Sequence, residues 1–263
     1  MIATAIKVAC SLTRLDTCAL VFLSIFAPVY FHSHDLYFSF THAAPVLTIC
    51  MCGFVINDLS DIEKDRENHP GRALPSNSIS EIGAGILYFT LLATSLALVK
   101  IYVGLPYVYL YALLLIALIN YNYVVCYIPI VKNVYVALVG LIPIYILSSL
   151  IENHSSIRVV APSLFLFLVG REMLMDVEDA AGDVGTLPKK IGIGLSENIA
   201  FGLKIAGSSC LCVLINGTIE AIVVLMSICL DAIFLYLWKA HIYRKPIIHA
   251  MKLQLLIGIY FLV

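Results

Sequence analysis

The chain has 263 residues, a formal net charge of −1, 61% hydrophobic residues and only 13% charged residues. This composition excludes an ordinary soluble domain, and the absence of a basic stripe with interleaved aromatic residues argues against a nucleic-acid partner. Residues 101–131 and 133–151 carry no charge at all, which indicates a membrane protein, because a spanning helix needs about 20 apolar residues.

In chain order, the first 13 residues are predicted to form a short interfacial helix. Nine apolar segments follow, and the expected fold class is all-α, a polytopic membrane helical bundle. The first segment has no small-residue cleavage site after it, which favours a retained anchor helix over a removed signal. The predicted spanning segments are 16–32, 42–58, 82–99, 105–127, 133–151, 159–176, 198–216, 219–238 and 247–263.

The distribution of lysine and arginine predicts the orientation. With the N-terminus in the cytoplasm, only Lys100 and Arg158 fall clearly on the opposite side of the membrane. Lys204 and Lys252 are expected near the cytoplasmic starts of their helices. We therefore expect a multi-pass protein whose N-terminus and acidic segments face the cytoplasm, with membrane lipid as a partner.

Two acidic motifs, within residues 57–65 and 176–183, share the spacing D-x2-D-x3-D and fall at the ends of the second and sixth predicted segments. On a helix, this spacing puts three carboxylates on one face, where they repel each other. Hard carboxylate oxygens suit Mg2+, which usually binds through carboxylates together with substrate phosphates. The aspartates are Asp58, Asp61 and Asp65 in the first motif, and Asp176, Asp179 and Asp183 in the second.

Two carboxylate banks that face each other predict a diphosphate held through bridging Mg2+, which neutralises the leaving group as its bond to carbon breaks. An apolar bundle suits a lipidic diphosphate, whose tail lies along the helices. The 15 tyrosines and 12 phenylalanines can stabilise the carbocation formed from an allylic diphosphate and exclude water. Cations expected at the same face as phosphate contacts are Arg66, Arg72, Lys132, Arg171, Lys189 and Lys190.

The residues around both motifs resemble the UbiA superfamily of intramembrane prenyltransferases. NDLSDIEKDRENHPGRALPS resembles its first acidic segment, and REMLMDVEDAAGDVGTLPKKIG resembles its second. Between them, YIPIVKNVYV is similar to the Tyr and Lys segment of the family, and Arg14 occupies the place of its first-helix arginine. The runs look closest to the digeranylgeranylglyceryl phosphate synthase and quinone prenyltransferase branch.

This resemblance implies one domain over residues 1–263, with nine spanning helices around a central cavity and two Mg2+ ions. It also implies transfer of a prenyl group from an allylic prenyl diphosphate to an aromatic or other small or lipid acceptor. Tyr127 would be an active-site tyrosine. The implied metal ligands are Asn57, Asp58, Asp61, Asp65, Asp176, Asp179 and Asp183. The implied diphosphate contacts are Asn57, Arg14, Arg66, Arg72, Lys132 and Arg171.

Two departures from the family pattern leave a terpene cyclase of the UbiA type, which needs no acceptor, as the alternative. Met175 stands where relatives often carry Lys, and the stretch from Asp183 to Thr186 is short. A cation-coupled transporter is disfavoured, because acidic residues crowd at one surface and only Asp231 lies deeper, as a possible polar partner inside the bundle. The repeated motif also suggests an internal pseudo-repeat.

Overall fold

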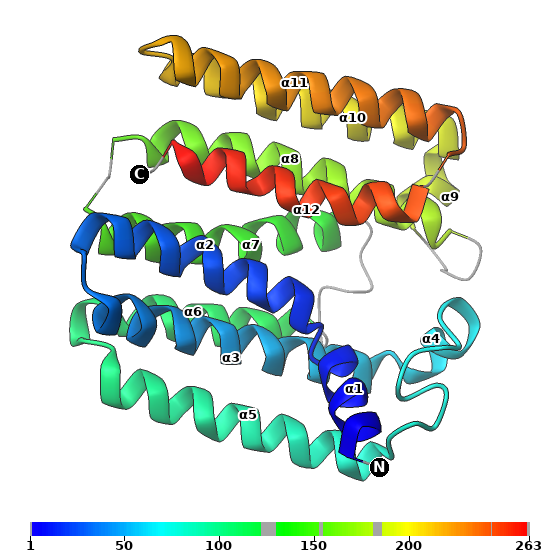
Figure 1. Ribbon diagram of the computed structural model, residues 1–263. Helices are drawn as coiled ribbons and strands as arrows, with labels where there is room; N and C mark the ends of the chain where they lie inside the picture. Colours follow the sequence, from blue (N-terminus) through cyan, green and yellow to red (C-terminus); the bar gives the residue numbers. More distant parts are fainter. Residues whose placement is uncertain (1, 122–129, 153–154, 181–185, 243, 262–263) are drawn as a thin grey trace. The chain divides into compact units, whose positions relative to one another are not determined.

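The computed structural model describes residues 2–121, 130–152, 155–180, 186–242 and 244–261, so Tyr127 and Asp183 lie outside the described residues. Throughout this part of the chain the regular elements are helices (Figure 1). They are α1 (Ile2–Leu12), α2 (Leu15–Ser33), α3 (Leu36–Ser60), α4 (Ile62–Asn68), α5 (Glu81–Tyr102), α6 (Leu105–Asn120), α7 (Val131–Leu150), α8 (Ile157–Glu178), α9 (Leu187–Ile191), α10 (Ile193–Cys210), η2 (Leu211–Leu214), α11 (Thr218–Lys239) and α12 (Arg244–Tyr260).

Each of the nine predicted spanning segments overlaps a described helix. Among the described helices, six are long and apolar enough to cross a membrane: α2, α3, α5, α7, α10 with η2, and α11. The helix α6 is described over 16 residues and α12 over 17. The helix α8 is long, but it carries five charged residues, four of them in its last eight positions. The expected all-helical fold is therefore present, and the count of nine spans stays a prediction.

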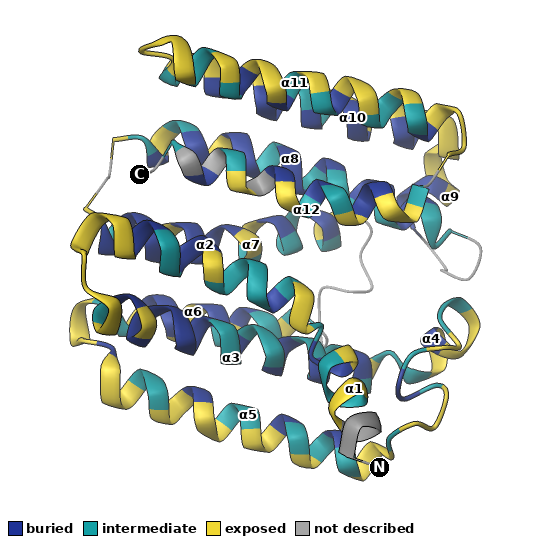
Figure 2. Ribbon diagram, viewed as in Figure 1, coloured by how far each residue is buried: buried dark blue, intermediate teal, exposed yellow. Residues whose placement is uncertain are grey.

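The helices α5 and α11 are the two most apolar of the six and also the least buried. Figure 2 shows exposed positions along both of them. Large apolar side chains such as Ile82, Phe89, Leu225 and Met226 are mostly exposed. A water-soluble protein would hide such a surface, whereas lipid solvates it at no cost.

The chain divides into two compact units, Met1–Cys126 and Tyr127–Val263. In the first unit α3 is the central helix, packed against α1, α2, α4, α5 and α6. Near its C-terminal end an apolar cluster joins α1, α3, α5 and the segment after α4. This cluster contains Leu12, Cys52, Val55, Ala73, Leu74, Ala84 and Tyr88. The first acidic motif thus begins on a helix end that is anchored from several sides.

In the second unit α8 is central, packed against α7, α9, α10 and α12. It approaches α10 closely because small residues line the contact. Ser163 Oγ donates a 2.6 Å hydrogen bond to the carbonyl oxygen of Gly207. A Cβ atom at Gly207 would lie 2.6 Å from the carbonyl oxygen of Ser163. Glycine at position 207 is therefore a condition of this helix pairing.

A buried ion pair joins α10 to α11. Lys204 Nζ lies 2.9 Å from Asp231 Oδ1, and both side chains are fully buried. Ser208 donates to Asp231 Oδ2 at 2.6 Å, and Gln254 of α12 donates to Asp231 Oδ1 at 3.0 Å. Asp231 is thus a polar partner inside the bundle. The expected place of Lys204 was wrong: α10 begins at Ile193, so Lys204 lies in the middle of its helix.

Candidate functional site

The first acidic motif does not lie on one uninterrupted helix. Asp58 occupies the last turn of α3, Asp61 forms the junction with φ −101° and ψ 12°, and Asp65 lies in α4. The Asp61 amide nevertheless donates to the Asn57 carbonyl at 3.0 Å, and the Asp65 amide donates to the Asp61 carbonyl at 2.8 Å. The helical hydrogen-bond spacing therefore continues across the interruption.

Two arginines neutralise the two buried aspartates of this motif. Arg14 Nη2 lies 3.0 Å from Asp58 Oδ1. Arg72 Nη1 lies 2.7 Å from Asp65 Oδ1 and 2.6 Å from Asp65 Oδ2, and it is 4.0 Å from Asp58 Oδ1. Asp58 is 5% exposed and Asp65 is 3% exposed, so each carboxylate needs a cationic partner to remain charged.

Arg14 reaches Asp58 from the junction between α1 and α2. Its backbone has φ 46° and ψ 53°, in the left-handed region. Its guanidinium carbon also lies 4.8 Å from the centre of the Phe54 ring, at a distance that suits a cation–π contact. Arg14 is 44 residues away from Asp58 in the sequence. It is held beside Asp58 by the ion pair and by the contact with the Phe54 ring.

Asp61 is the less buried member of the motif. Asn57 Nδ2 donates to Asp61 Oδ2 at 3.2 Å. Burial raises the pKa of the Asp61 carboxyl above its ordinary value, and the opposing effect of Lys64 is smaller. Asp65 also raises this pKa, since a second negative charge nearby disfavours ionisation. A cation bound nearby would therefore stabilise the charged form of the Asp61 carboxyl.

Arg66 lies apart from the Asp58 and Asp65 pairs. Its Nη1 is 2.6 Å from Glu63 Oε1, and both side chains are exposed, at 51% and 85%. This is an ordinary surface pair at i,i+3 spacing. The structure therefore groups Arg14 and Arg72, but not Arg66, with the buried aspartates.

The second motif lies at the C-terminal end of α8. Asp176 is in the last turn and Asp179 caps the helix, while Asp183 is outside the described residues. Lys132 Nζ forms an ion pair with Asp176 Oδ1, and Asn133 Nδ2 donates to Asp176 Oδ2 at 3.0 Å. Lys132 and Asn133 belong to the first turn of α7, whose positive dipole end also favours a carboxylate.

Three buried side-chain atoms in the described part of the chain have no hydrogen-bond partner: Asn133 Oδ1, Arg171 Nε and Thr186 Oγ1. Asn133 contacts Asp176, and Arg171 and Thr186 both belong to the second family-like segment, which begins at Arg171. Buried polar atoms without partners are rare and call for a ligand or water. Sequence reasoning missed Asn133 and Thr186 as site residues, although Asn133 directly follows Lys132.

Two further α8 residues near the second motif, Arg171 and Met175, have mostly buried contacts. Arg171 Nη1 lies 2.6 Å from Glu172 Oε1, and both side chains are largely buried. Met175 packs against an apolar cluster that includes Leu174, Phe201 and Trp238. The thioether therefore contributes an apolar contact at the position where the family resemblance led us to expect a lysine.

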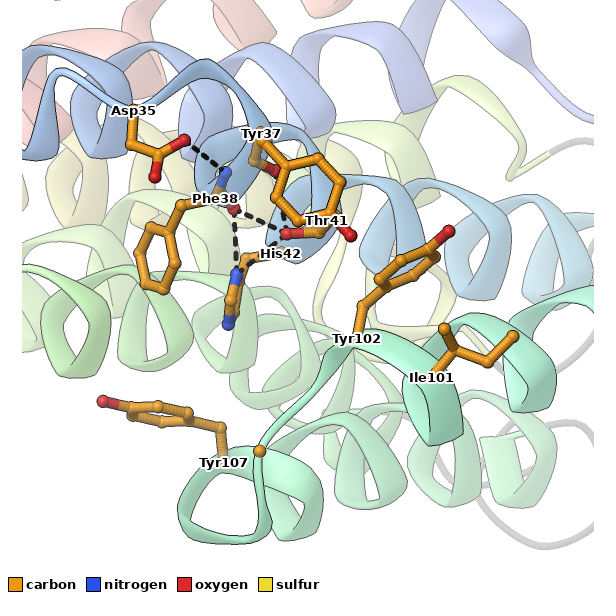
Figure 3. Close-up of a pocket in the computed structure, with 9 residues that line it drawn as sticks. Asp35, Tyr37, Phe38, Thr41, His42, Ile101, Tyr102 and Tyr107 are labelled. Atoms are coloured by element: carbon orange, nitrogen blue, oxygen red, sulfur yellow. Dashed lines mark hydrogen bonds between the residues drawn. The ribbon is translucent and has the colours of Figure 1, made fainter.

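A pocket of about 430 Å³ lies at the other end of α3, between its N-terminus and the α5–α6 turn (Figure 3). Its lining includes Asp35, Phe38, His42 and Tyr107. The Phe38 carbonyl accepts a 2.9 Å hydrogen bond from His42 Nδ1. Asp58 lies roughly 24 Å farther along the helix axis, from the rise per residue. The pocket is therefore separate from the first acidic motif.

Comparison with known proteins decides the family. The model of the UbiA prenyltransferase family matches residues 16–254, which is most of the chain. The chain belongs to the UbiA prenyltransferase family. With its six apolar helices, it is an integral membrane protein of that family.

Curated proteins similar to this chain include digeranylgeranylglyceryl phosphate synthases. The one from Methanoculleus marisnigri is 33% identical over 175 residues, covering 60% of this chain and 59% of the relative. The one from Methanococcus aeolicus is 32% identical over 163 residues, covering 57% of this chain and 55% of the relative. The chain thus matches less than two thirds of the length of these relatives.

Solved UbiA structures share the fold over nearly the whole chain. A digeranylgeranylglyceryl phosphate synthase is 23% identical, with a TM-score of 0.68 and coverage of 98% of this chain and 96% of that one. A UbiA homologue from Archaeoglobus fulgidus, bound to GPP and Mg2+, is 14% identical, with a TM-score of 0.74 and coverage of 97% and 98%. At these identities the likeness establishes the fold.

Proposed function

We propose that this protein is an Mg2+-dependent intramembrane prenyltransferase, which moves a prenyl group from an allylic prenyl diphosphate to an acceptor. One observation carries the proposal: the nearly buried aspartates of both motifs already hold cations, Arg14, Arg72 and Lys132. Each carboxylate therefore lies at a place built to receive positive charge. Membership of a prenyltransferase family supplies the reaction.

The residues present fit Mg2+. Carboxylates and an unpartnered carboxamide oxygen, Asn133 Oδ1, are the hard oxygen donors that this ion prefers. Within the described ranges, no three His, Cys, Asp or Glu side chains lie close enough to hold a metal by themselves. Mg2+ usually takes one or two carboxylates and completes its shell with substrate phosphates and water.

The proposed ligands are Asp58, Asp61, Asp65, Asp176, Asp179 and Asp183, with Asn57 beside the first set. When bound, Mg2+ would offset the charge that develops on the diphosphate. Two ions, an action of both motifs on one diphosphate, and a cytoplasmic face for both motifs stay predictions. Tyr127 as an active-site tyrosine stays a prediction too.

The basic side chains have the complementary task. Arg14, Arg72 and Lys132 pair with the carboxylates of the two motifs, and they would also bind phosphate oxygens of the diphosphate. Arg171 has an unpartnered buried Nε–H, which suits a phosphate oxygen. Apolar helix faces exclude water, which would otherwise capture the allylic cation. Solved relatives hold GPP or DMAPP with Mg2+.

The test uses the full chain in lipid nanodiscs with radiolabelled geranylgeranyl diphosphate. Acceptors are geranylgeranylglyceryl phosphate, suggested by the curated relatives, and an aromatic acid. We expect EDTA to abolish transfer and Mg2+ to restore it. Asp58→Asn and Asp176→Asn should each lower turnover by about 100-fold or more, since each removes a charge from the leaving-group site. Asp35→Asn is the control, because Asn also caps a helix and Asp35 starts α3 at its far end.

Unchanged turnover in both motif variants would overturn the proposal. A reaction without acceptor distinguishes the alternative, since a cyclase would release a cyclic hydrocarbon from the diphosphate alone. Product analysis by mass spectrometry separates transfer from cyclisation.

A further inference from the structure

A buried carboxylate outside both acidic motifs organises one end of the second unit. Glu197 of α10 is 5% exposed. It accepts hydrogen bonds from Trp238 Nε1 at 2.9 Å, Lys239 Nζ at 2.8 Å and Arg244 Nη2 at 3.0 Å. Three donors from the end of α11 and the start of α12 offset the cost of burying this charge.

Arg244 connects this carboxylate to α8. Its Nη2 binds Glu197, and its Nη1 lies 3.7 Å from Oε1 of Glu178. Its guanidinium carbon lies 4.8 Å from the centre of the Trp238 ring, and its Nε donates to the Trp238 carbonyl at 3.4 Å. The planar fork of arginine is therefore fixed on one face and directed at two carboxylates, a geometry that lysine does not reproduce.

Glu178 is the last residue of α8 and is adjacent to Asp179, and Asp176 lies two residues before it. Three acidic residues at a helix C-terminus oppose the helix dipole, which is negative at that end. A cation placed there relieves this repulsion. Through these contacts of Arg244, the C-terminal ends of α8 and α11 are joined to the starts of α10 and α12, and Figure 1 shows the ends of these helices on the same side of the second unit.

We propose that Arg244, held by Glu197 and Trp238, is a positioning residue for the second acidic motif. Arg244 is described in contact with Glu178, Glu197 and Trp238. It fixes the end of α8, so that these two carboxylates stay in the arrangement that binds metal and diphosphate. This role rests on the proposed function. The contacts of Arg244 with Glu178, Glu197 and Trp238, which we call the brace, are a property of the fold.

Arg244→Gln is the test, with Lys239→Gln as its matched control. Both variants remove one positive charge from Glu197, but Lys239 is 42% exposed, and its described contact is with Glu197 alone. Hydrogen–deuterium exchange of full-length protein in nanodiscs reports on residues 172–180. We expect exchange there to rise roughly tenfold in Arg244→Gln, through easier local opening, and to stay at the wild-type rate in Lys239→Gln.

Kinetics then tests the positioning role. In Arg244→Gln the Mg2+ concentration for half-maximal turnover should rise about tenfold, as outer-shell substitutions typically weaken metal binding, with kcat largely recovered at saturating Mg2+. Arg244→Lys should restore part of this affinity.

Equal exchange in Arg244→Gln and Lys239→Gln would overturn the brace. Faster exchange with an unchanged Mg2+ requirement would overturn the positioning role. An inactive wild type would refute the proposed function, and with it the positioning role. Hydrogen–deuterium exchange of residues 172–180 would still test whether the brace holds the end of α8.

Discussion

Arg72 differs from Arg66 in what its side chain holds, although both lie beside the first motif. Arg72 Nη1 binds both oxygens of the buried Asp65. Arg66 binds the exposed Glu63. Removing the cation from a buried carboxylate typically costs about 3–5 kcal/mol, because the charge is left without a partner, whereas an exposed i,i+3 pair is worth about 0.5 kcal/mol or less. The two arginines are thus unequal candidates for the diphosphate site.

We therefore expect Arg72→Gln to lower prenyl transfer by about 100-fold, since it leaves Asp65 buried without a partner and removes a phosphate contact. Arg66→Gln should lower it by less than about threefold, as expected for a solvated pair. Initial rates at saturating diphosphate decide between them. An equal loss in both variants would restore Arg66 to the site that the sequence motif predicted for it.

The acidic side chains could be found from sequence because their spacing is local, whereas most of their partners are remote. Arg14 and Asp58 are 44 residues apart, as are Lys132 and Asp176. Family resemblance, not spacing, singled out Arg14. Asn133 was not predicted as a site residue, because the feature that marks it is a buried side-chain oxygen without a hydrogen-bond partner. Only the packed structure reveals such an atom.

The α8–α10 pairing depends on the absence of a side chain at Gly207. Gly202 lies on the same helix, and a Cβ there would meet nothing within 4 Å. The same substitution at these positions therefore has opposite expected effects.

We expect Gly207→Ala to destabilise the protein by about 2 kcal/mol, because the helices must separate to admit a methyl group. Gly202→Ala should be neutral or stabilising by up to about 1 kcal/mol, from higher helix propensity. Denaturant unfolding in mild detergent measures both. A similar loss for Gly202→Ala would show that helix separation is not the cause.

The pair of Lys204 and Asp231 makes a second prediction for α10 and α11. Lys204→Met leaves Asp231 buried beside Ser208 and Gln254 without its cation. We expect a loss of about 3–5 kcal/mol in the free energy of unfolding, and a smaller loss in the double variant Lys204→Met with Asp231→Leu. Thermal unfolding of the single and double variants tests the coupling, and additive losses would contradict it.

Helix boundaries explain why these interior contacts were not predicted. The apolar pattern placed the α10 segment from residue 198, but the helix begins at Ile193. That shift moves Lys204 from near a helix end to its middle. Similarly, D-x2-D-x3-D indicates helical spacing but does not reveal the junction at Asp61, because the residues on both sides have helical propensity.

Each of the two compact units is built around the helix that leads into an acidic motif, α3 in the first and α8 in the second. The all-helical membrane fold followed from composition and apolar periodicity, and the family from motif residues. The internal pseudo-repeat stays a prediction, although a central acidic helix in each unit is what such a repeat would produce.

Orientation in the membrane can be checked with single cysteines in a variant without native cysteine. Lys190→Cys in α9 and Asn216→Cys between η2 and α11 occupy exposed positions. The Lys and Arg distribution predicts that an impermeant maleimide labels position 216 from outside the cell and labels position 190 only after the membrane is opened. The reverse pattern would invert the topology.

Arg14 shows how a turn and a charge compete for one residue. Its left-handed backbone conformation destabilises the folded chain by about 1 kcal/mol, and a glycine at this position would avoid that cost. Glycine would make the α1–α2 connection more stable, yet it would leave Asp58 without its 3.0 Å partner. The residue that suits the connection best is therefore not the one that suits the carboxylate, and a more stable α1–α2 connection would lower the affinity for diphosphate that we propose for this site.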